Sequence, residues 1–331
     1  MKKVLFLVFL VAGLIGLLTL FAYQKDIQKN ETEVEQKITV LLDWFPNTNH
    51  TGLYVALAKG YFKEQKLQVN IVQPGEGEAV QIIASGHADF GISSQESVTL
   101  ARAKDIPIVS IAAILQHNTS AFASKKEAGI TKVADFEGKR YGGWGSPIEE
   151  ATLKALMDVA GANYSKIKNI TIGTTDFFST IGRESDFQWI FYGWDGVEAK
   201  RRGIALNLIW LKDLDPVLDY YTPVIVTNGK HIDEQKDLTY RFMKAVSDGY
   251  EYTTKHPEEA AEILIKAVPE VNADLVRQSQ AWLTPHYKKD AIKWGTQKRE
   301  VWERYAKWLY DRGLIEKMIN PEAAFTNEFL P

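Results

Sequence analysis

From residue 38 onward, the chain alternates short apolar runs with helical patterns, and this alternation restricts its fold more than any other feature. The apolar runs have the length of strands and lie at residues 38–42, 67–73, 89–93, 108–115, 140–143, 170–172, 189–193, 205–211 and 223–227. Helical patterns separate most of them, as at residues 53–59 and 147–159. Strands that alternate with helices indicate βαβ units and mostly parallel sheets. The sequence therefore predicts an α/β fold.

The order of these segments predicts two lobes. A second set of strands begins after Phe136, and the strand at residues 223–227 returns to the first set. We predict a first lobe from residues 38–121 and 223–331, and a second lobe from residues 122–222. Two lobes joined by two crossings of the chain leave a cleft that can close over a ligand.

Four helical patterns follow the second crossing, at residues 233–254, 257–267, 272–283 and 296–311. In the last of them Trp302, Tyr305 and Trp308 recur at three-residue spacing. Aromatic residues at this spacing form one face of a helix, so we predict that they pack against the core.

The first 22 residues differ in character from the rest. Lys2 and Lys3 precede an apolar run at residues 4–22. This arrangement is typical of a secretory signal, and the run is also long enough to span a bilayer. Positive charges on its amino side direct the rest of the chain out of the cytosol. We expect residues 1–22 to be a signal or anchor helix that holds the protein on the extracytoplasmic face of the membrane, followed by a polar, flexible linker at residues 23–37.

The composition excludes several classes of function. At 331 residues the chain is long enough for about two domains. A net charge of −3 and the lack of a long basic run give no support to nucleic-acid binding. The chain has no cysteine, which excludes disulfides, thiolate metal sites and a cysteine nucleophile.

The loop after the first predicted strand carries the residues best suited to bind a ligand. In open α/β sheets, ligands bind in the crevice outside the carboxyl ends of the strands. This loop places there a carboxylate, an indole, two amides and an imidazole, which belong to Asp43, Trp44, Asn47, Asn49 and His50. Ring stacking combined with a few fixed hydrogen bonds suits a flat, polar heterocycle.

The residues of this loop also have a structural interpretation. Asp43 can cap a turn and Trp44 can fill a core. His50 stands just before a predicted helix, where backbone groups can satisfy its ring. Because no Glu or His stands at helical spacing from His50, we predict no metal site there.

Later strand ends carry further candidates. Gln95 follows the strand at residues 89–93, where its amide can bind a planar ligand, although Ser93 or Ser94 can equally cap the next helix. Trp144 belongs to a glycine-rich turn that can cradle a phosphate. This turn lacks the Lys-Ser/Thr ending of a P-loop, so we favour close approach of its backbone to a heterocycle.

The strand at residues 189–193 ends in three more candidates. We expect Tyr192 or Trp194 to stack on the ligand ring opposite Trp44. Glu198 either pairs with an amidine-like edge of the ligand or only joins Asp195 in a capping arrangement.

Three motifs carry a resemblance to a known family. Residues 43–56 follow the pattern D-W-x-P-N-x-x-H-x-G-x-Y-x-A, residues 59–67 follow K-G-Y-F-x-x-x-x-L, and residues 86–92 follow G-x-A-D-F-G-I. Together they resemble the thiamine-pyrimidine-precursor group of solute-binding proteins, and the resemblance extends over residues 38–331.

This resemblance implies a type II periplasmic-binding fold, with two mixed-sheet lobes and a ligand held between them. It implies a binding protein without enzymatic activity or cofactor, which delivers its ligand to an ABC permease and its ATPase. The implied ligand is a pyrimidine precursor of vitamin B1, such as N-formyl-4-amino-5-aminomethyl-2-methylpyrimidine. Close relatives carry riboflavin-type precursors, which are an alternative.

Two departures from the group follow from the lack of cysteine. Members from Gram-positive cells carry a lipobox cysteine, so an uncleaved N-terminal helix must replace the lipid anchor here. The related pyrimidine-precursor synthases carry a cysteine-rich iron-binding motif, which is missing. An enzyme that uses Asp43 and His50 as general base and acid is the alternative to a carrier, and turnover of the pyrimidine separates the two.

Overall fold

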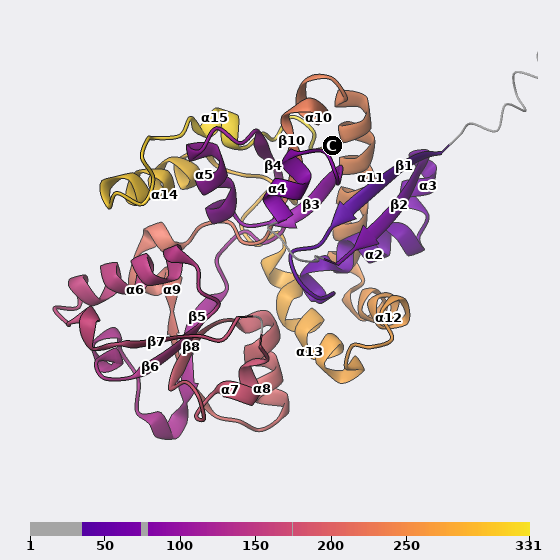
Figure 1. Ribbon diagram of the computed structural model, residues 1–331. Helices are drawn as coiled ribbons and strands as arrows, with labels where there is room; N and C mark the ends of the chain where they lie inside the picture. Colours follow the sequence, from indigo (N-terminus) through magenta and orange to yellow (C-terminus); the bar gives the residue numbers. More distant parts are fainter. Residues whose placement is uncertain (1–34, 74–78, 174) are drawn as a thin grey trace, which may run out of the picture.

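The computed structural model describes residues 35–73, 79–173 and 175–331, which form a mixed α/β fold with two five-stranded sheets. The first sheet has the spatial order β2 (Leu67–Val72), β1 (Gln36–Leu41), β3 (Phe90–Ser93), β10 (Val224–Asn228) and β4 (Ile108–Ala113). The second has the order β7 (Lys168–Thr171), β6 (Arg140–Gly143), β8 (Phe187–Phe191), β5 (Ser120–Lys125) and β9 (Leu206–Trp210). Each sheet has its own helices and forms one lobe (Figure 1).

Both sheets are mixed, and the antiparallel strand of each is the one that enters from the other lobe. In the first sheet, β10 is antiparallel to β3 and β4, whereas β1 is parallel to β2 and β3. In the second, β5 is antiparallel to β8 and β9, whereas β6 is parallel to β7 and β8. A parallel neighbour requires a crossover connection on the same sheet, and a strand that arrives from the other lobe has none.

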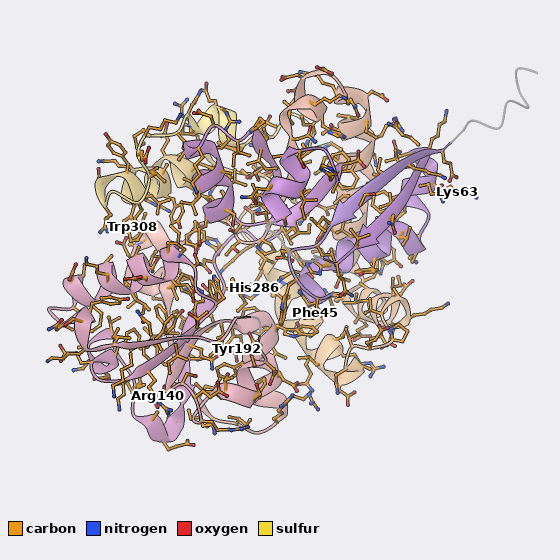
Figure 2. The ribbon with its side chains drawn as sticks, viewed as in Figure 1. Phe45, Lys63, Arg140, Tyr192, His286 and Trp308 are labelled. Carbon is orange, nitrogen blue, oxygen red and sulfur yellow. The ribbon has the colours of Figure 1, made fainter. Side chains whose placement is uncertain are left out.

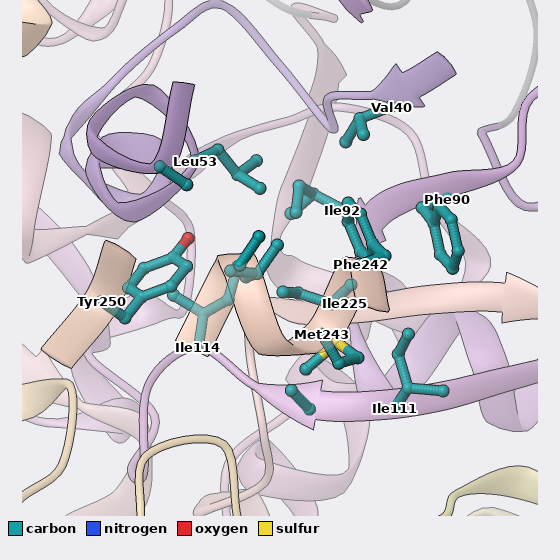
Figure 3. Close-up of a cluster of buried hydrophobic side chains, with 14 of the residues drawn as sticks. Val40, Leu53, Phe90, Ile92, Ile111, Ile114, Ile225, Phe242, Met243 and Tyr250 are labelled. Atoms are coloured by element: carbon teal, nitrogen blue, oxygen red, sulfur yellow. The ribbon is translucent and has the colours of Figure 1, made fainter. Parts of the chain in front are cut away.

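Helices cover the two faces of the first sheet. One face packs against α2 (Thr51–Ala58), α3 (Tyr61–Glu64) and α11 (Lys236–Lys255), and the other against α4 (Ala79–Ala84), α5 (Gln95–Ala103) and α15 (Pro321–Ala324). The strands serve both cores because their side chains alternate. Thus Val40 packs with Leu53 and Phe242 on the first face (Figure 3), whereas Leu41 packs with Ile83 on the second.

Three more helices complete the first lobe. α10 (Gly229–Asp233) leads from β10 into α11. α12 (Pro257–Ala267) and α13 (Ala273–Leu283) form an antiparallel pair beside α2. This pair projects toward the second lobe (Figure 1), and α13 contacts it directly.

The second lobe is built around an aromatic core. Phe136 and Phe187 stack with ring centroids 4.1 Å apart, and Phe122 contacts both rings edge-on. α6 (Pro147–Val159) covers this core, and α9 (Leu211–Leu214) closes one side. The opposite face carries α7 (Phe177–Thr180), and α8 (Val197–Arg201) follows β8 beside α13.

The two crossings run side by side and are hydrogen-bonded to one another. The first crossing comprises residues 114–119 and the second residues 218–223. Buried Asn118 joins them: its side chain donates to Leu218 O at 2.8 Å and its backbone N donates to Asp219 Oδ1 at 2.9 Å. His117 Nδ1 lies 2.7 Å from Asp219 Oδ2, and this hydrogen bond raises the pKa of His117. The crossings therefore form one connected hinge.

Helix α14 (Arg299–Asp311) packs into the cores of both lobes. Trp302 belongs to the core of the first lobe, whereas Tyr305 and Trp308 belong to the core of the second. All three side chains are buried, which confirms the predicted packing face. The ring of Tyr305 also lies 4.5 Å from that of Tyr220 in the second crossing.

The predicted α/β alternation is confirmed, with two corrections. β5 lies between β8 and β9 in the second sheet, but no strand was predicted at residues 120–125. β1 begins at Gln36, inside the predicted linker. The expected signal or anchor helix at residues 1–22 lies outside the described residues, and within those residues no helix combines the length and apolarity that crossing a membrane requires.

Helices α2 and α11 approach closely at two glycines, which gives a test of the packing. A Cβ on Gly249 would stand 2.1 Å from Gly52 O and 3.0 Å from the Ala56 side chain. Alanine in a helix interior is normally more stable than glycine by about 1 kcal/mol. We expect the reverse for Gly249→Ala, a loss of about 1–3 kcal/mol, because the facing atom belongs to the backbone and cannot yield.

Urea denaturation measures this change. Asp248→Ala, on the same helix and partly exposed, is the matched control and should alter stability by no more than about 0.5 kcal/mol. A Gly249→Ala protein that unfolds at higher urea than the wild type would contradict the described contact.

Candidate ligand-binding site

A cavity of about 800 Å³ lies between the two lobes. Its wall comes from the loop after β1, the second crossing and α13 on one side, and from the strand ends of the second lobe on the other. Eight of the lining residues are aromatic: Trp44, Phe45, Trp144, Phe177, Phe178, Trp189, Phe191 and Trp194. Phe45 is 58% exposed and Trp144 is 41% exposed, so large apolar surfaces remain exposed at the cavity. Such surfaces mark a place where a ligand binds.

The loop after β1 supplies polar groups of two kinds. Asn47 caps the short 3-10 helix η1 (Thr48–His50), since its Oδ1 accepts from Asn49 N at 2.9 Å, and its amide nitrogen donates to Phe45 O. The side-chain oxygen of Asn49 is buried and has no hydrogen-bond partner in the described structure. Both residues line the cavity. Asn47 is therefore committed to the loop, whereas Asn49 has an acceptor to offer.

His50 does not line the cavity, contrary to its expected role as a direct contact. Its side chain is fully buried, and Nε2 lies 2.8 Å from Asp43 Oδ1. Asp43 does line the cavity, and its side chain is 34% exposed. The imidazole thus lies behind the carboxylate that faces the cavity.

Gln95 also lies outside the lining residues. Its side-chain oxygen accepts from Tyr221 N at 2.9 Å, and its backbone N donates to Tyr221 O at 3.0 Å. Ser94 caps α5, as the structural alternative predicted. Gln95 therefore holds the second crossing in place and does not face a ligand.

Tyr192 does not line the cavity, so of the two residues expected to stack opposite Trp44 only Trp194 lies in the wall. After β8 the chain makes a single π-helical turn, η5 (Tyr192–Gly196). Within this turn the Tyr192 ring packs on Trp210 and Trp282, with centroids 5.1 Å and 4.9 Å away. Figure 2 shows Tyr192 at the junction of the lobes. The π-helical turn therefore changes the direction of the Tyr192 side chain, which the strand pattern had placed in the cavity.

Trp194 lines the cavity and also joins the lobes. It leaves the second lobe and packs against an apolar cluster of α12 and α13 that contains Leu264 and Val276. Beside it, Ser279 of α13 donates a hydrogen bond to Gly193 O, and Thr48 of the first loop bonds to the same hydroxyl. The loops on opposite sides of the cavity are thereby connected through α13.

The glycine-rich turn before α6 is occupied by the chain itself. Trp144 N, Gly145 N and Ser146 N all donate to the Glu149 carboxylate, at 3.2, 2.9 and 2.9 Å. Tyr141 OH donates to the same group at 2.6 Å. These N–H groups are the ones that a bound phosphate would need, so the turn has no free donors for it. Trp144 projects its ring beside Trp189, with centroids 5.6 Å apart.

Glu198 lines the cavity but is paired within the protein. Its carboxylate accepts from Arg201 Nε at 2.6 Å and from Arg202 Nε at 2.5 Å. These hydrogen bonds hold the pKa of Glu198 below its usual value. The Arg202 guanidinium in turn lies 4.2 Å above the Phe178 ring. Glu198 is therefore neither part of a capping arrangement with Asp195 nor free to pair with a ligand.

Asp195 also lines the cavity, and it has no cationic partner in the described structure. Burial, together with the nearby negative charges of Asp176 and Glu198, raises its pKa to about 7. It was expected only to start a helix. An unpaired carboxyl with a shifted pKa in a cavity wall is a characteristic of a functional group.

Sequence reasoning also missed the segment around α7. Asp176, Phe177 and Phe178 all line the cavity. They follow β7, the strand expected at residues 170–172, so the rule that strand ends carry the site would have found them.

Comparison with known proteins identifies one family and two relatives that match most of the chain. The family model described as NMT1/THI5 like matches residues 47–260. A formylaminopyrimidine-binding protein of Halalkalibacterium halodurans is 28% identical and covers 96% of this chain and 98% of its own. A 4-amino-5-hydroxymethyl-2-methylpyrimidine phosphate synthase of Legionella pneumophila is 24% identical over 91% of this chain and 94% of its own.

Among solved structures, the periplasmic aliphatic sulphonate-binding protein SsuA of Escherichia coli superposes with a TM-score of 0.66. It is 15% identical, and the match covers 87% of this chain and 96% of that chain. This likeness shows the fold, which is that of periplasmic binding proteins.

Asp195 allows a test of the cavity through stability. Its carboxyl should be protonated in both folded and unfolded protein below about pH 4, whereas between pH 4 and 7 only the unfolded form ionises readily. The folded protein therefore loses stability over this range, and the loss is complete above pH 7. We expect Asp195→Asn to raise the melting temperature at pH 8 and to leave it unchanged near pH 3.5.

Thermal melts at the two pH values measure this effect. Asp213→Asn, an exposed carboxylate on α9, should produce little change at either pH. Lower stability of Asp195→Asn at pH 8 would show that the Asp195 carboxylate is stabilised in the folded protein.

Proposed function

Because the chain belongs to the NMT1/THI5-like family, we propose that it is the extracytoplasmic solute-binding protein of an ABC importer for a thiamine pyrimidine precursor. The proposed ligand is N-formyl-4-amino-5-aminomethyl-2-methylpyrimidine or a close analogue. The observation that carries the proposal is the inter-lobe cavity, whose wall combines exposed aromatic side chains with a small number of carboxyl and amide groups. The similarity to a formylaminopyrimidine-binding protein along almost the whole chain supports the same ligand class.

The aromatic wall suits a flat ring. Trp44 lies on the first lobe, and Trp144 and Trp194 lie on the second, so indoles are available on both sides of a bound heterocycle. Stacking of this kind adds about 0.5–1.5 kcal/mol per ring pair to the area that is buried. We assign the stacking to these three residues, and Tyr192 takes no part.

The carboxyls suit the polar edge of an aminopyrimidine. That edge offers an exocyclic amine as donor next to a basic ring nitrogen. Asp43 can accept from the amine, and Asp195, with a pKa of about 7, can share a proton with a ring nitrogen. Asn49 Oδ1 is a further acceptor. The wall holds four carboxylates against two guanidiniums, which favours a neutral or cationic ligand over an anion.

We further propose that residues 1–22 export the chain and keep it at the membrane, where the ABC permease and ATPase receive the ligand. The apolar run after Lys2 and Lys3 supports this location. Membrane fractionation followed by sequencing of the mature N-terminus measures it. An intact N-terminus in the membrane fraction is expected, and a soluble protein that begins after residue 22 would show that the segment is cleaved.

Recovery of the ligand tests the function directly. We expect mass spectrometry of protein purified without denaturation to detect the intact formylaminopyrimidine. Incubation of the protein with this compound should leave its mass unchanged. A converted pyrimidine product would instead favour the alternative of a pyrimidine-precursor enzyme, in line with the similarity to a synthase.

A matched pair of variants tests the stacking role of Trp44. Trp44→Ala should weaken binding about ten-fold or more in calorimetric titration, because one stacking face is lost. Tyr240→Ala removes a 49%-exposed aromatic ring from α11 outside the cavity, and it should bind as the wild type does. Equal affinities for the two variants would remove Trp44 from the site.

A further inference from the structure

The hydrogen bonds of His50 fix the position of its proton. Nδ1 lies 3.2 Å from the backbone N of Asn47, and Nε2 lies 2.8 Å from Asp43 Oδ1. A backbone N–H can only donate, so Nδ1 is the acceptor and the proton of the neutral ring is on Nε2. Nε2–H therefore donates to the Asp43 carboxylate.

Asp43 consequently has two different oxygens. Oδ1 is taken by His50, and the other oxygen accepts no hydrogen bond from the described residues. A hydrogen bond from Nε2–H is stronger to a carboxylate than to a neutral carboxyl, so this contact favours the carboxylate form of Asp43. Asp43 thus presents one acceptor oxygen and no proton to the cavity that it lines.

Two buried tyrosines hold the backbone next to His50. Tyr287 OH donates to Thr48 O at 2.5 Å, and Tyr250 OH donates to Asn49 O at 2.7 Å. Both tyrosines are fully buried, and the Tyr250 ring lies against Gly52 so closely that a Cβ there would stand 2.4 Å away. The imidazole therefore cannot move away from Asp43 without the loss of buried hydrogen bonds.

We propose that His50 is a positioning residue that makes the cavity selective for an amino over an oxo heterocycle. It acts through Asp43, which it holds in the acceptor-only form. A ligand N–H at this point gains a charged hydrogen bond, whereas a ligand carbonyl meets an oxygen that has no proton to give. This inference rests on the proposed function, because it assumes that a pyrimidine occupies the cavity.

Two substitutions at residue 50 separate this role from support of the loop. The amide of glutamine reaches the place of Nε2, so His50→Gln keeps a donor to Asp43. The amide of asparagine reaches only the place of Nδ1, so His50→Asn keeps the acceptor for Asn47 N and loses the donor. Thermal melts establish that each variant is folded.

The experiment is calorimetric titration of each protein with N-formyl-4-amino-5-aminomethyl-2-methylpyrimidine and with its 4-oxo analogue. The wild type should prefer the amino compound by about ten-fold or more, the factor that one charged hydrogen bond supplies. His50→Gln should keep this preference, and His50→Asn should lose most of it. Asp43→Asn should lose it as well, and adding His50→Asn to that variant should change the ratio no further.

The outcomes separate the two proposals. If His50→Asn keeps the wild-type ratio, or if both substitutions reduce it equally, the positioning role is wrong. If His50→Asn does not fold, a wild-type ratio in Asp43→Asn overturns the proposal instead. A wild-type protein that binds both compounds equally refutes the selectivity alone, whereas one that binds neither refutes the proposed function as well.

Discussion

The hydrogen bonds between the two crossings determine where the lobes stand, and the cavity depends on them. Asn118 is fully buried, so each of its polar atoms needs a partner. It finds them in Leu218, Asp219 and Ser120, which belong to the second crossing and to the first strand of the second lobe. Gln95 adds a second fixed point on Tyr221. The buried amide side chains of Asn118 and Gln95 therefore determine how the two crossings, which connect the sheets, lie against one another.

The two lobes contribute different chemistry to the cavity. The first lobe supplies a loop whose backbone is held by hydrogen bonds from two buried tyrosines. Within this loop the Asn49 side-chain oxygen has no hydrogen-bond partner among the described residues. The second supplies most of the aromatic surface and the paired Glu198, Arg201 and Arg202. Trp194 and α13 connect these walls. Closure of the lobes thus brings a rigid polar edge to an apolar face.

The sequence was sufficient for the fold, and it placed seven candidate residues in the wall of the cavity, because both follow from the alternation of strands and helices. Asp43, Trp44, Asn47, Asn49, Trp144, Trp194 and Glu198 line the cavity because they follow strands in the expected way. Strand β5 escaped prediction because small residues such as Ser120 and Ala123 give no apolar run, although all but its last residue are buried. Its burial comes from its position between β8 and β9, which is a tertiary property.

The direction of individual side chains was the part that the sequence could not provide. Tyr192 turns away because β8 ends in a π-helical turn, which no local pattern announces. His50 and Gln95 lie in the expected loops but face inward, where His50 donates to Asp43 and Gln95 accepts from Tyr221 N. Asp195 was missed because the sequence does not show that its carboxyl is buried without a cationic partner among the described residues. Pairing of buried polar groups is decided across the fold and not along the chain.

The carboxylate at the start of α6 has a consequence for the range of compounds that the protein can hold. Glu149 stands only three or four residues from the N–H groups of Ser146 and Gly145, so a free anion must compete with a carboxylate that is part of the same chain. A phosphate ester of the same heterocycle would gain nothing from this helix and would still have to shed its water. The start of α6 thus offers no attraction to a phosphate group, although its sequence is rich in glycine.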